Sequence, residues 1–106
     1  MRIQVVNFSL VEMSGKDHLS QVEAIAPAFA GLSGLISKTW LANSESNTYG
    51  VVYVWRDREA MEACKQTDFY NGMLANPHFE NITSTDFGVL ENSTLVTRGS
   101  VQVSAA

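Results

Sequence analysis

Hydrophobic and polar positions alternate in four stretches of the chain, and a period of two residues is typical of β-strands. The stretches cover residues 2–10, 35–42, 48–56 and 82–90. The second and third are separated only by the polar segment 43–47, which is a common length for a hairpin loop. The pattern therefore predicts four strands, of which the middle two form a hairpin.

Apolar residues recur at helical spacing after the first predicted strand. Ser14, Gly15 and Asp17 break the strand pattern there and offer capping side chains. The apolar stripe that follows consists of Leu19, Val22, Ile25, Ala26 and Phe29. Pro27 lies within it and removes a backbone donor, so we expect this helix to kink or tighten near its end.

A second helical region follows the hairpin. Asp57 is suited to cap a helix that starts at Arg58, and Asp68 could cap a further short helix through Leu74, which Asn76 and the proline after it would end. The resulting order is β-α-β-β-α-β, the arrangement of ferredoxin-like folds. We expect an α+β protein with an antiparallel four-stranded sheet. Residues 1–106 would form a single domain, with 92–106 as an extended C-terminal tail whose Leu95, Val96, Val101 and Val103 could pair at a sheet edge.

Both faces of the strand over 48–56 are apolar. Tyr49, Tyr53 and Trp55 share one face, and Val52 and Val54 lie on the other. An antiparallel strand with one solvated face should instead alternate cleanly between apolar and polar residues. Two helices cover only one face of a sheet, so a second copy of the chain is expected to cover the other, in a homodimer with two-fold symmetry.

The composition agrees with a covered surface. Charged residues make up only 17% of the chain, below the usual quarter, while hydrophobic residues make up 45%. The net charge of −4, without any run of basic residues, argues against a nucleic-acid partner. A single cysteine, Cys64, excludes an internal disulfide and favours a reducing compartment. The chain shows no signal-peptide pattern and no apolar run long enough to span a bilayer, so no membrane partner and a cytoplasmic location are expected.

Three segments together resemble a known family. They are residues 34–43 with Trp40, residues 47–55 with Tyr49 and Gly50, and residues 60–63. This pattern is similar to that of the YdhR-type monooxygenases, in the dimeric α/β-barrel superfamily with the antibiotic-biosynthesis monooxygenases. The likeness extends over most of residues 2–90. Many family members have two adjacent glycines where this chain has Gly50 and Val51, which would narrow the local space.

The resemblance implies a pocket between sheet and helices, and the oxidation of polyphenol-like or anthrone-like aromatic molecules without metal or flavin. In that chemistry the substrate loses a proton and the resulting carbanion passes an electron to dioxygen. The sequence itself contains no metal-ligand spacing around His18 or His78, no dinucleotide-binding glycine motif and no phosphate loop. No cofactor is therefore expected.

Four aromatic residues are candidates for the walls of a substrate pocket: Trp40, Tyr49, Tyr53 and Trp55. Their rings could hold a planar substrate while their polar tips orient it, although plain core or interface packing explains any one of them as well. Asn7 interrupts an apolar strand and could donate a hydrogen bond to a substrate oxygen. Either His78 or Asp86 could act as the catalytic base, the former in a loop and the latter in the fourth predicted strand.

Three further residues receive structural interpretations. His18, at a helix start, is expected to be exposed, and Cys64 to be inert core. Lys38 lies between apolar neighbours and is expected to extend its ammonium group away from an interface. The first functional hypothesis is a cofactor-independent monooxygenase acting on a hydrophobic aromatic molecule. A non-oxidative polyketide cyclase or isomerase, and a non-catalytic ligand-binding stress-response dimer, remain alternatives.

Overall fold

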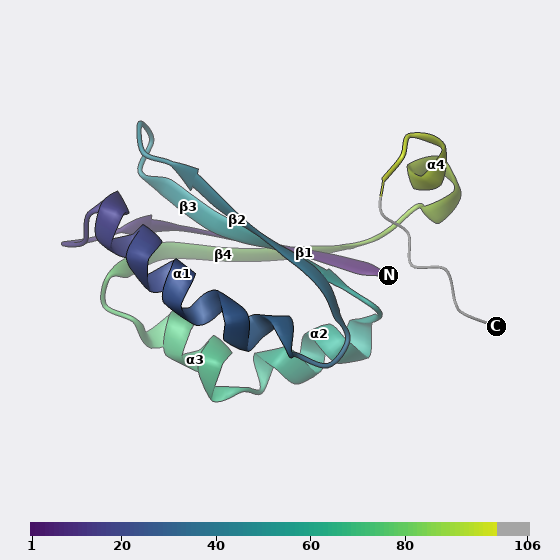
Figure 1. Cartoon of the computed structure of the whole chain (residues 1–106), viewed down its shortest axis with the longest axis horizontal. Helices are drawn as coiled ribbons and strands as arrows, with labels where there is room; N and C mark the ends of the chain where they lie inside the picture. Colours follow the sequence, from purple (N-terminus) through teal and green to yellow (C-terminus); the bar gives the residue numbers. More distant parts are fainter. Residues whose placement is uncertain (100–106) are drawn as a thin grey trace.

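The computed structural model describes residues 1–99 of the chain. Four strands and four helices follow one another in the order β1 (Arg2–Leu10), α1 (Gly15–Ala30), β2 (Leu35–Asn43), β3 (Thr48–Trp55), α2 (Arg58–Lys65), α3 (Asp68–Ala75), β4 (Phe79–Gly88) and α4 (Glu91–Val96). The strands form one antiparallel sheet in the order β2-β3-β1-β4. Helices α1, α2 and α3 cover one face of it (Figure 1). The predicted ferredoxin-like α+β fold is confirmed.

Side-chain caps fix where the helices begin. The Ser14 hydroxyl accepts a hydrogen bond from the backbone N–H of Asp17, and the Asp57 carboxylate accepts one from that of Ala60 at 2.8 Å. Both caps match the sequence prediction. Thr67, one residue before the predicted Asp68, caps α3 by accepting from the N–H of Tyr70.

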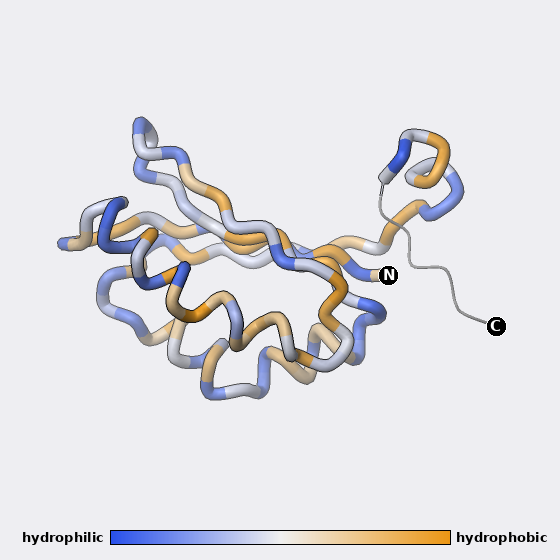
Figure 2. The backbone as a smooth tube through the Cα atoms, viewed as in Figure 1, coloured by the Kyte–Doolittle hydropathy of each residue, from blue (hydrophilic) through white to orange (hydrophobic). Residues whose placement is uncertain are grey.

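The core lies between the sheet and the helices. Its largest fully buried side chains come from the central strands and α2: Trp55, Tyr53, Met61, Gln4 and Val6. Gln4 is the buried polar residue among them, and its Oε1 accepts a hydrogen bond from Nε1 of Trp55 at 3.1 Å. The amide of Gln4 also donates to the hydroxyl of Ser84 at 3.2 Å. Hydrophobic positions lie along the strands and along the helices that cover them (Figure 2).

The opposite face of the sheet carries a second set of apolar side chains. Ile3 and Val5 of β1 lie beside Val54 and Val52 of β3 in the strand register. All four are only partly buried, and Phe87 of β4, paired with Ile3, is 56% exposed. No helix described in residues 1–99 lies over this face, as Figure 1 shows. The two-sided apolar character of the sheet, expected from the sequence, is thus present in the structure.

The end of the chain differs from the prediction. Strand β4 begins at Phe79 instead of residue 82, because the antiparallel ladder with β1 continues to the pair Leu10–Phe79. Residues Glu91–Val96 form helix α4, which stands apart from the sheet, where strand pairing by Leu95 and Val96 was expected. That expectation is wrong for these residues, and Val101 and Val103 lie outside the described part. Within residues 1–99, none of the helices has the length and hydropathy needed to cross a membrane.

Candidate functional site

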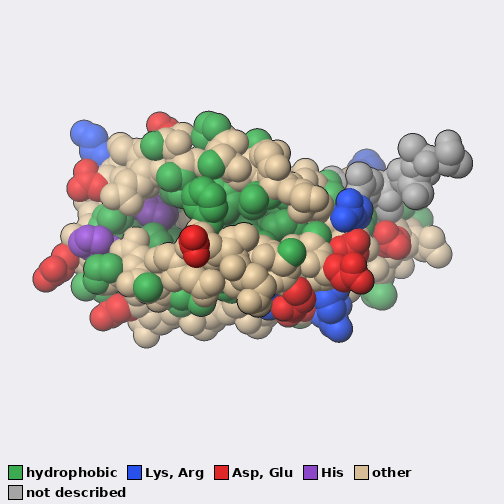
Figure 3. All heavy atoms as spheres, turned by 90° about the horizontal axis from the view of Figure 1, so that it is seen from below, with side chains coloured by type: hydrophobic (Ala, Val, Ile, Leu, Met, Phe, Trp, Pro, Cys, Tyr) green, Lys and Arg blue, Asp and Glu red, His purple; other side chains and the backbone are tan. Residues whose placement is uncertain are grey.

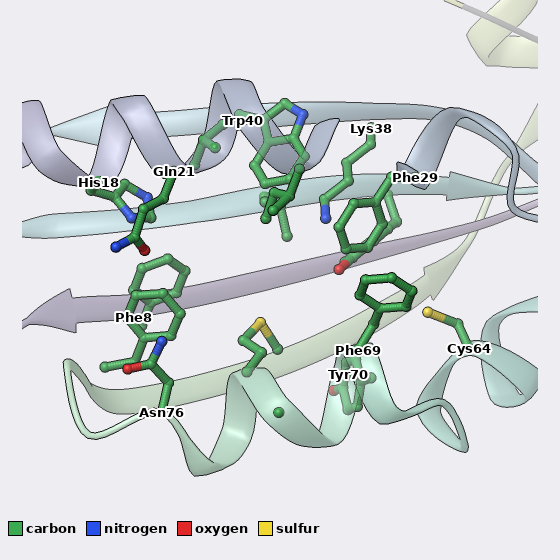
Figure 4. Close-up of a pocket in the computed structure, with 17 residues that line it drawn as sticks. Phe8, His18, Gln21, Phe29, Lys38, Trp40, Cys64, Phe69, Tyr70 and Asn76 are labelled. Atoms are coloured by element: carbon green, nitrogen blue, oxygen red, sulfur yellow. The ribbon is translucent and has the colours of Figure 1, made fainter. Parts of the chain in front are cut away.

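An apolar cavity of about 190 Å³ lies between the sheet and the helices α1 and α3. On the helical face of the molecule, hydrophobic side chains gather in an elongated hollow (Figure 3). Seen from inside, α1 forms one long wall, α3 forms the other, and the strands form the floor (Figure 4). Aromatic rings dominate the lining: Phe8, Phe29, Trp40, Tyr53, Phe69, Tyr70 and Phe79. Such a site suits a flat apolar molecule.

Lys38 extends from β2 into this cavity (Figure 4). Its Nζ lies 3.2 Å from the centre of the Phe29 ring, 3.8 Å from that of Trp40 and 4.6 Å from that of Tyr53. Aromatic faces attract a cation, so these rings form a cage around the ammonium group. Burial nevertheless lowers the pKa of Lys38 to about 7, because the apolar surroundings disfavour its charged form.

His18 occupies the other end of the cavity, on the first turn of α1. Its ring lies edge-on to three aromatic rings, with centroid distances of 5.6 Å to Phe8, 5.2 Å to Tyr49 and 5.8 Å to Phe79. Burial lowers the pKa of His18, so the imidazole is neutral near pH 7. Its Nδ1 is buried and has no hydrogen-bond partner within residues 1–99. A neutral imidazole has one ring nitrogen that can accept a proton.

Amide and thiol groups supply the other polar atoms of the cavity. Gln21 of α1 lies beside His18, and Asn76 at the end of α3 lies across the cavity from both (Figure 4). Cys64 of α2 lies toward the opposite end. Burial raises the pKa of its thiol, which keeps it protonated near neutral pH. No carboxylate lines the cavity among the described residues.

The structure separates the four predicted wall residues. Trp40 and Tyr53 line the cavity. Tyr49 touches it only through its contact with His18. Trp55 is fully buried in the core and stacks on Tyr53 with ring centroids 5.3 Å apart. Its indole N–H already donates a hydrogen bond to Gln4. Two of the four residues are thus placed to touch a ligand directly.

Asn7, His78 and Asp86 do not line the cavity. Asn7 lies on the far face of the sheet, opposite Gly50 in the register. Nδ1 of His78 donates to the backbone carbonyl of Val11 at 2.8 Å, which fixes its ring in the loop before β4. Asp86 pairs with Arg2, whose hydrogen bond holds the pKa of that carboxyl below its usual range. The structure therefore offers no contact through which these three residues would reach a ligand in the cavity.

The sequence did not indicate that two basic side chains, His18 and Lys38, would line the cavity. His18 is partly buried where exposure was expected, because its ring packs edge-on against the rings of Phe8 and Phe79. Lys38 points into the cavity where an interface was expected. The hairpin register pairs it with Tyr53, so its side chain shares the face of the aromatic residues. That register follows from the short loop, which was the signal available in the sequence.

The arrangement combines a planar apolar slot with a neutral imidazole at one end and an amine at the other. It can bind an aromatic molecule, accept a proton from it and hold a negative charge. Residues 1–99 contain no group of three or more histidine, cysteine or acidic side chains that could hold a metal ion. The fold and this cavity define a ferredoxin-like α+β protein with an apolar cavity between its sheet and its helices.

The chain belongs to the family described as "Putative mono-oxygenase ydhR", whose model matches residues 3–100. The resemblance noted from the hairpin and the second helix is thereby confirmed. None of the curated proteins matches the chain significantly.

Solved structures with the same fold include several oxygenases. The cofactor-independent oxygenase SnoaB from Streptomyces nogalater, as an N63A mutant, shares 20% identity over 85% of this chain and 94% of its own, with a TM-score of 0.65. A "putative antibiotic biosynthesis monooxygenase" from Deinococcus radiodurans shares 15% sequence identity. The match covers 99% of this chain and 100% of that protein, with a TM-score of 0.70. The heme-degrader MhuD from Mycobacterium tuberculosis, with two hemes bound in its active site, shares 18% sequence identity. The match covers 85% of this chain and 96% of MhuD, with a TM-score of 0.69. At these identities the likeness establishes the fold.

Proposed function

We propose that the protein is a cofactor-independent monooxygenase that oxidises a hydrophobic aromatic small molecule in the cavity between sheet and helices. The observation that carries the proposal is the placement of His18, a neutral proton acceptor with a free Nδ1, inside an aromatic-walled slot. Membership of the mono-oxygenase family supports it, and so does the shared fold with the cofactor-independent oxygenase SnoaB.

The reaction begins with proton transfer. A substrate carbon next to an aromatic carbonyl or phenol gives its proton to His18, which is neutral and can accept it. The resulting carbanion transfers one electron to dioxygen, and recombination of the radical pair forms a carbon–oxygen bond. The peroxide anion then takes the proton back from His18 to give a hydroperoxide. Loss of water from the hydroperoxide then gives a carbonyl product, so that CH₂ and O₂ become C=O and H₂O. The amides of Gln21 and Asn76 supply donors for the developing oxyanion.

The slot itself sets which substrates fit. Its floor and walls are mostly aromatic, and Phe29 of α1 meets Phe69 of α3 with ring centroids 5.7 Å apart, so the two walls close on each other there. Ligand pockets for drug-sized molecules usually measure roughly 300–1,000 Å³, whereas this cavity measures about 190 Å³. A small planar substrate is therefore favoured.

A heme does not fit these residues. A tetrapyrrole is at least as large as a typical drug-sized ligand, and the cavity is smaller than the usual pockets for such ligands. His18, the histidine that lines the cavity, is enclosed edge-on by the rings of Phe8, Tyr49 and Phe79. Reaching an iron atom would require these rings to move apart. The heme chemistry of MhuD is accordingly not carried over.

The proposal includes a homodimer. The far face of the sheet exposes parts of Ile3, Val5, Val52 and Val54 in one contiguous apolar surface. The same surface on a second copy covers it with the same residues, as a two-fold axis requires. Two sheets packed in this way bury apolar area from both chains, which stabilises a small domain.

Oxygen uptake tests the activity. Metal-stripped protein is mixed with a panel of anthrones and hydroquinones in an oxygen-electrode cell, and the products are identified by mass spectrometry. Uptake above the protein-free rate, with a matching oxygenated product, is expected. Binding of these compounds without uptake would contradict the oxygenase and favour an isomerase, a cyclase or a binding protein on the same cavity.

A further inference from the structure

The ammonium group of Lys38 lies in an apolar cavity without a counter-ion. The ion pairs within residues 1–99 involve other basic groups, and none of them reaches Lys38. A buried charge is normally paired or hydrogen-bonded, since an unpaired one is costly. The aromatic cage of Phe29, Trp40 and Tyr53 offsets part of this cost and provides no negative charge.

The titratable groups that face the cavity do not supply the missing charge. Cys64 interacts electrostatically with Lys38, but burial raises the pKa of its thiol and keeps it neutral. Burial also raises the pKa of Tyr53 far above neutrality, so its phenol is uncharged. His18 on α1 carries no negative charge in any form, and Tyr70 on α3 accepts a hydrogen bond from Gln4 through its hydroxyl. A ligand that carries a negative charge would pair with the ammonium form of Lys38, which these groups leave without a counter-ion.

We propose that the cavity selects aromatic molecules bearing an acidic hydroxyl, and that Lys38 binds them as the phenolate, with its ammonium group against the ring oxygen. The geometry matches this ligand. An aromatic ring in the slot contacts Trp40 and Phe29, which surround Nζ, so the ligand's ring is held by the same rings that position the charge. The inference rests on the proposed function, for which it names the substrate class.

The proton balance of binding is simple. When the amine is neutral, the phenolic O–H bond breaks and an N–H bond forms on Nζ, so a neutral pair becomes an ion pair. When the amine is already protonated, the ligand enters as the anion and no proton moves. A lowered pKa of about 7 makes both forms of Lys38 accessible near neutrality. Charge-assisted hydrogen bonds of this kind are stronger than neutral ones.

A coloured phenol reports this state directly, without turnover. Para-nitrophenol absorbs at longer wavelength as the phenolate than as the phenol, and para-nitroanisole has the same ring system and cannot ionise. Both are titrated into the wild-type chain and into Lys38→Met, which keeps most of the aliphatic stem. Lys38→Arg retains a positive charge, and Lys16→Met removes an exposed lysine of α1 as the matched control. Circular dichroism establishes that each variant is folded.

The expected result is bound phenolate, at a pH where the free compound is partly protonated, in the wild type and Lys16→Met. Lys38→Met should bind about 10- to 100-fold more weakly, which corresponds to losing a hydrogen bond between charged groups. Lys38→Arg should retain phenolate binding in part. Para-nitroanisole should bind weakly, with little difference between the variants.

Three outcomes would overturn the inference. Equal affinity and an equal spectrum in the wild type and Lys38→Met would show that the ammonium group does not pair with the ligand. If para-nitroanisole binds as tightly as para-nitrophenol, the cavity is an apolar slot that does not select a phenolate. Oxygen uptake with other substrates would in that case still support the oxygenase proposal. Failure of the folded wild type to bind either compound would remove the inference, and oxygen-uptake data would then decide separately whether the oxygenase proposal also fails.

Discussion

Lys38 and Tyr53 lie directly opposite each other on β2 and β3, and the amine nitrogen of the one lies 4.6 Å from the ring centre of the other. The pair places a basic group and an aromatic face on the same side of the sheet, under α1. The ring of Trp55 stacks on that of Tyr53 and is itself fully buried in the core. The cavity floor is therefore rigid where the lysine emerges from it.

Lys38 should make the stability of the fold depend on pH. Its pKa is 10.5 in an unfolded chain and about 7 in the folded one. Between these values the unfolded state binds more protons, so the free energy of unfolding should rise with pH from about 7 to about 10.5. After allowance for partial exposure, we expect a gain on the order of 1 kcal/mol relative to Lys38→Met. Denaturant unfolding of both proteins over this pH range measures it; parallel pH profiles would contradict the lowered pKa.

His18 should control turnover, and His78 should not. His18→Gln removes the proton acceptor in the cavity and should slow oxygen uptake by about 10²- to 10⁴-fold, the usual contribution of a general base. His78→Gln and Asp86→Asn alter residues that do not line the cavity, so their rates should stay within about twofold of the wild type, as for surface changes distant from the site. Oxygen-electrode rates on folded variants decide the matter. Loss of activity in His78→Gln with retention in His18→Gln would reverse our assignment.

Gln4 should be essential to the core. In Gln4→Leu the indole N–H of Trp55 and the hydroxyl of Ser84 lose their partner. A buried donor left unsatisfied costs about 1–3 kcal/mol, so the unfolding midpoint should fall clearly. Ser84→Ala removes a single hydrogen bond at an exposed strand position and serves as the milder control. Equal stability of Gln4→Leu and the wild type would show that the apolar side chain replaces the amide without loss.

A charge on the far face of the sheet should dissociate the proposed dimer. Val52→Glu places a carboxylate at the centre of the surface that the second copy would cover, and burying an unpaired charge is strongly unfavourable. Sedimentation velocity at micromolar concentration should show a dimer for the wild type and a monomer for this variant. Ser20→Glu, on the exposed side of α1, should remain dimeric. A monomeric wild-type protein would refute the homodimer.

The sequence was sufficient to predict four strands in the right order along the chain, with the start of the fourth misplaced by three residues. The alternation in residues 2–10 and 48–56 depends only on local side-chain direction, and the structure has β1 and β3 within one residue of those ranges. The caps at Ser14 and Asp57 were also predictable, because each cap is a contact between residues three apart in the chain. These strands and caps could be predicted because they depend on residues close together in the chain.

The site was predicted less well because it depends on contacts between distant segments. His18 meets Phe79 only after α1 has crossed the sheet, sixty-one residues away in the chain, and no local pattern reports that meeting. Asp86 looked like a free carboxylate because its partner, Arg2, is eighty-four residues away. The position of Lys38 could have been predicted from the sequence, since the hairpin register alone places it beside Tyr53.

Helix α1 contributes several side chains to the lining of the cavity, and yet none of its side chains is fully buried. The free energy that holds it against the sheet is therefore small compared with that of β1 or β3, whose side chains fill the core. Backbone amides of α1 should exchange with deuterium early, through local opening, while those of the central strands stay protected. A ligand seated between α1 and α3 would add buried contacts to this helix, so ligand binding should slow the exchange of its amides.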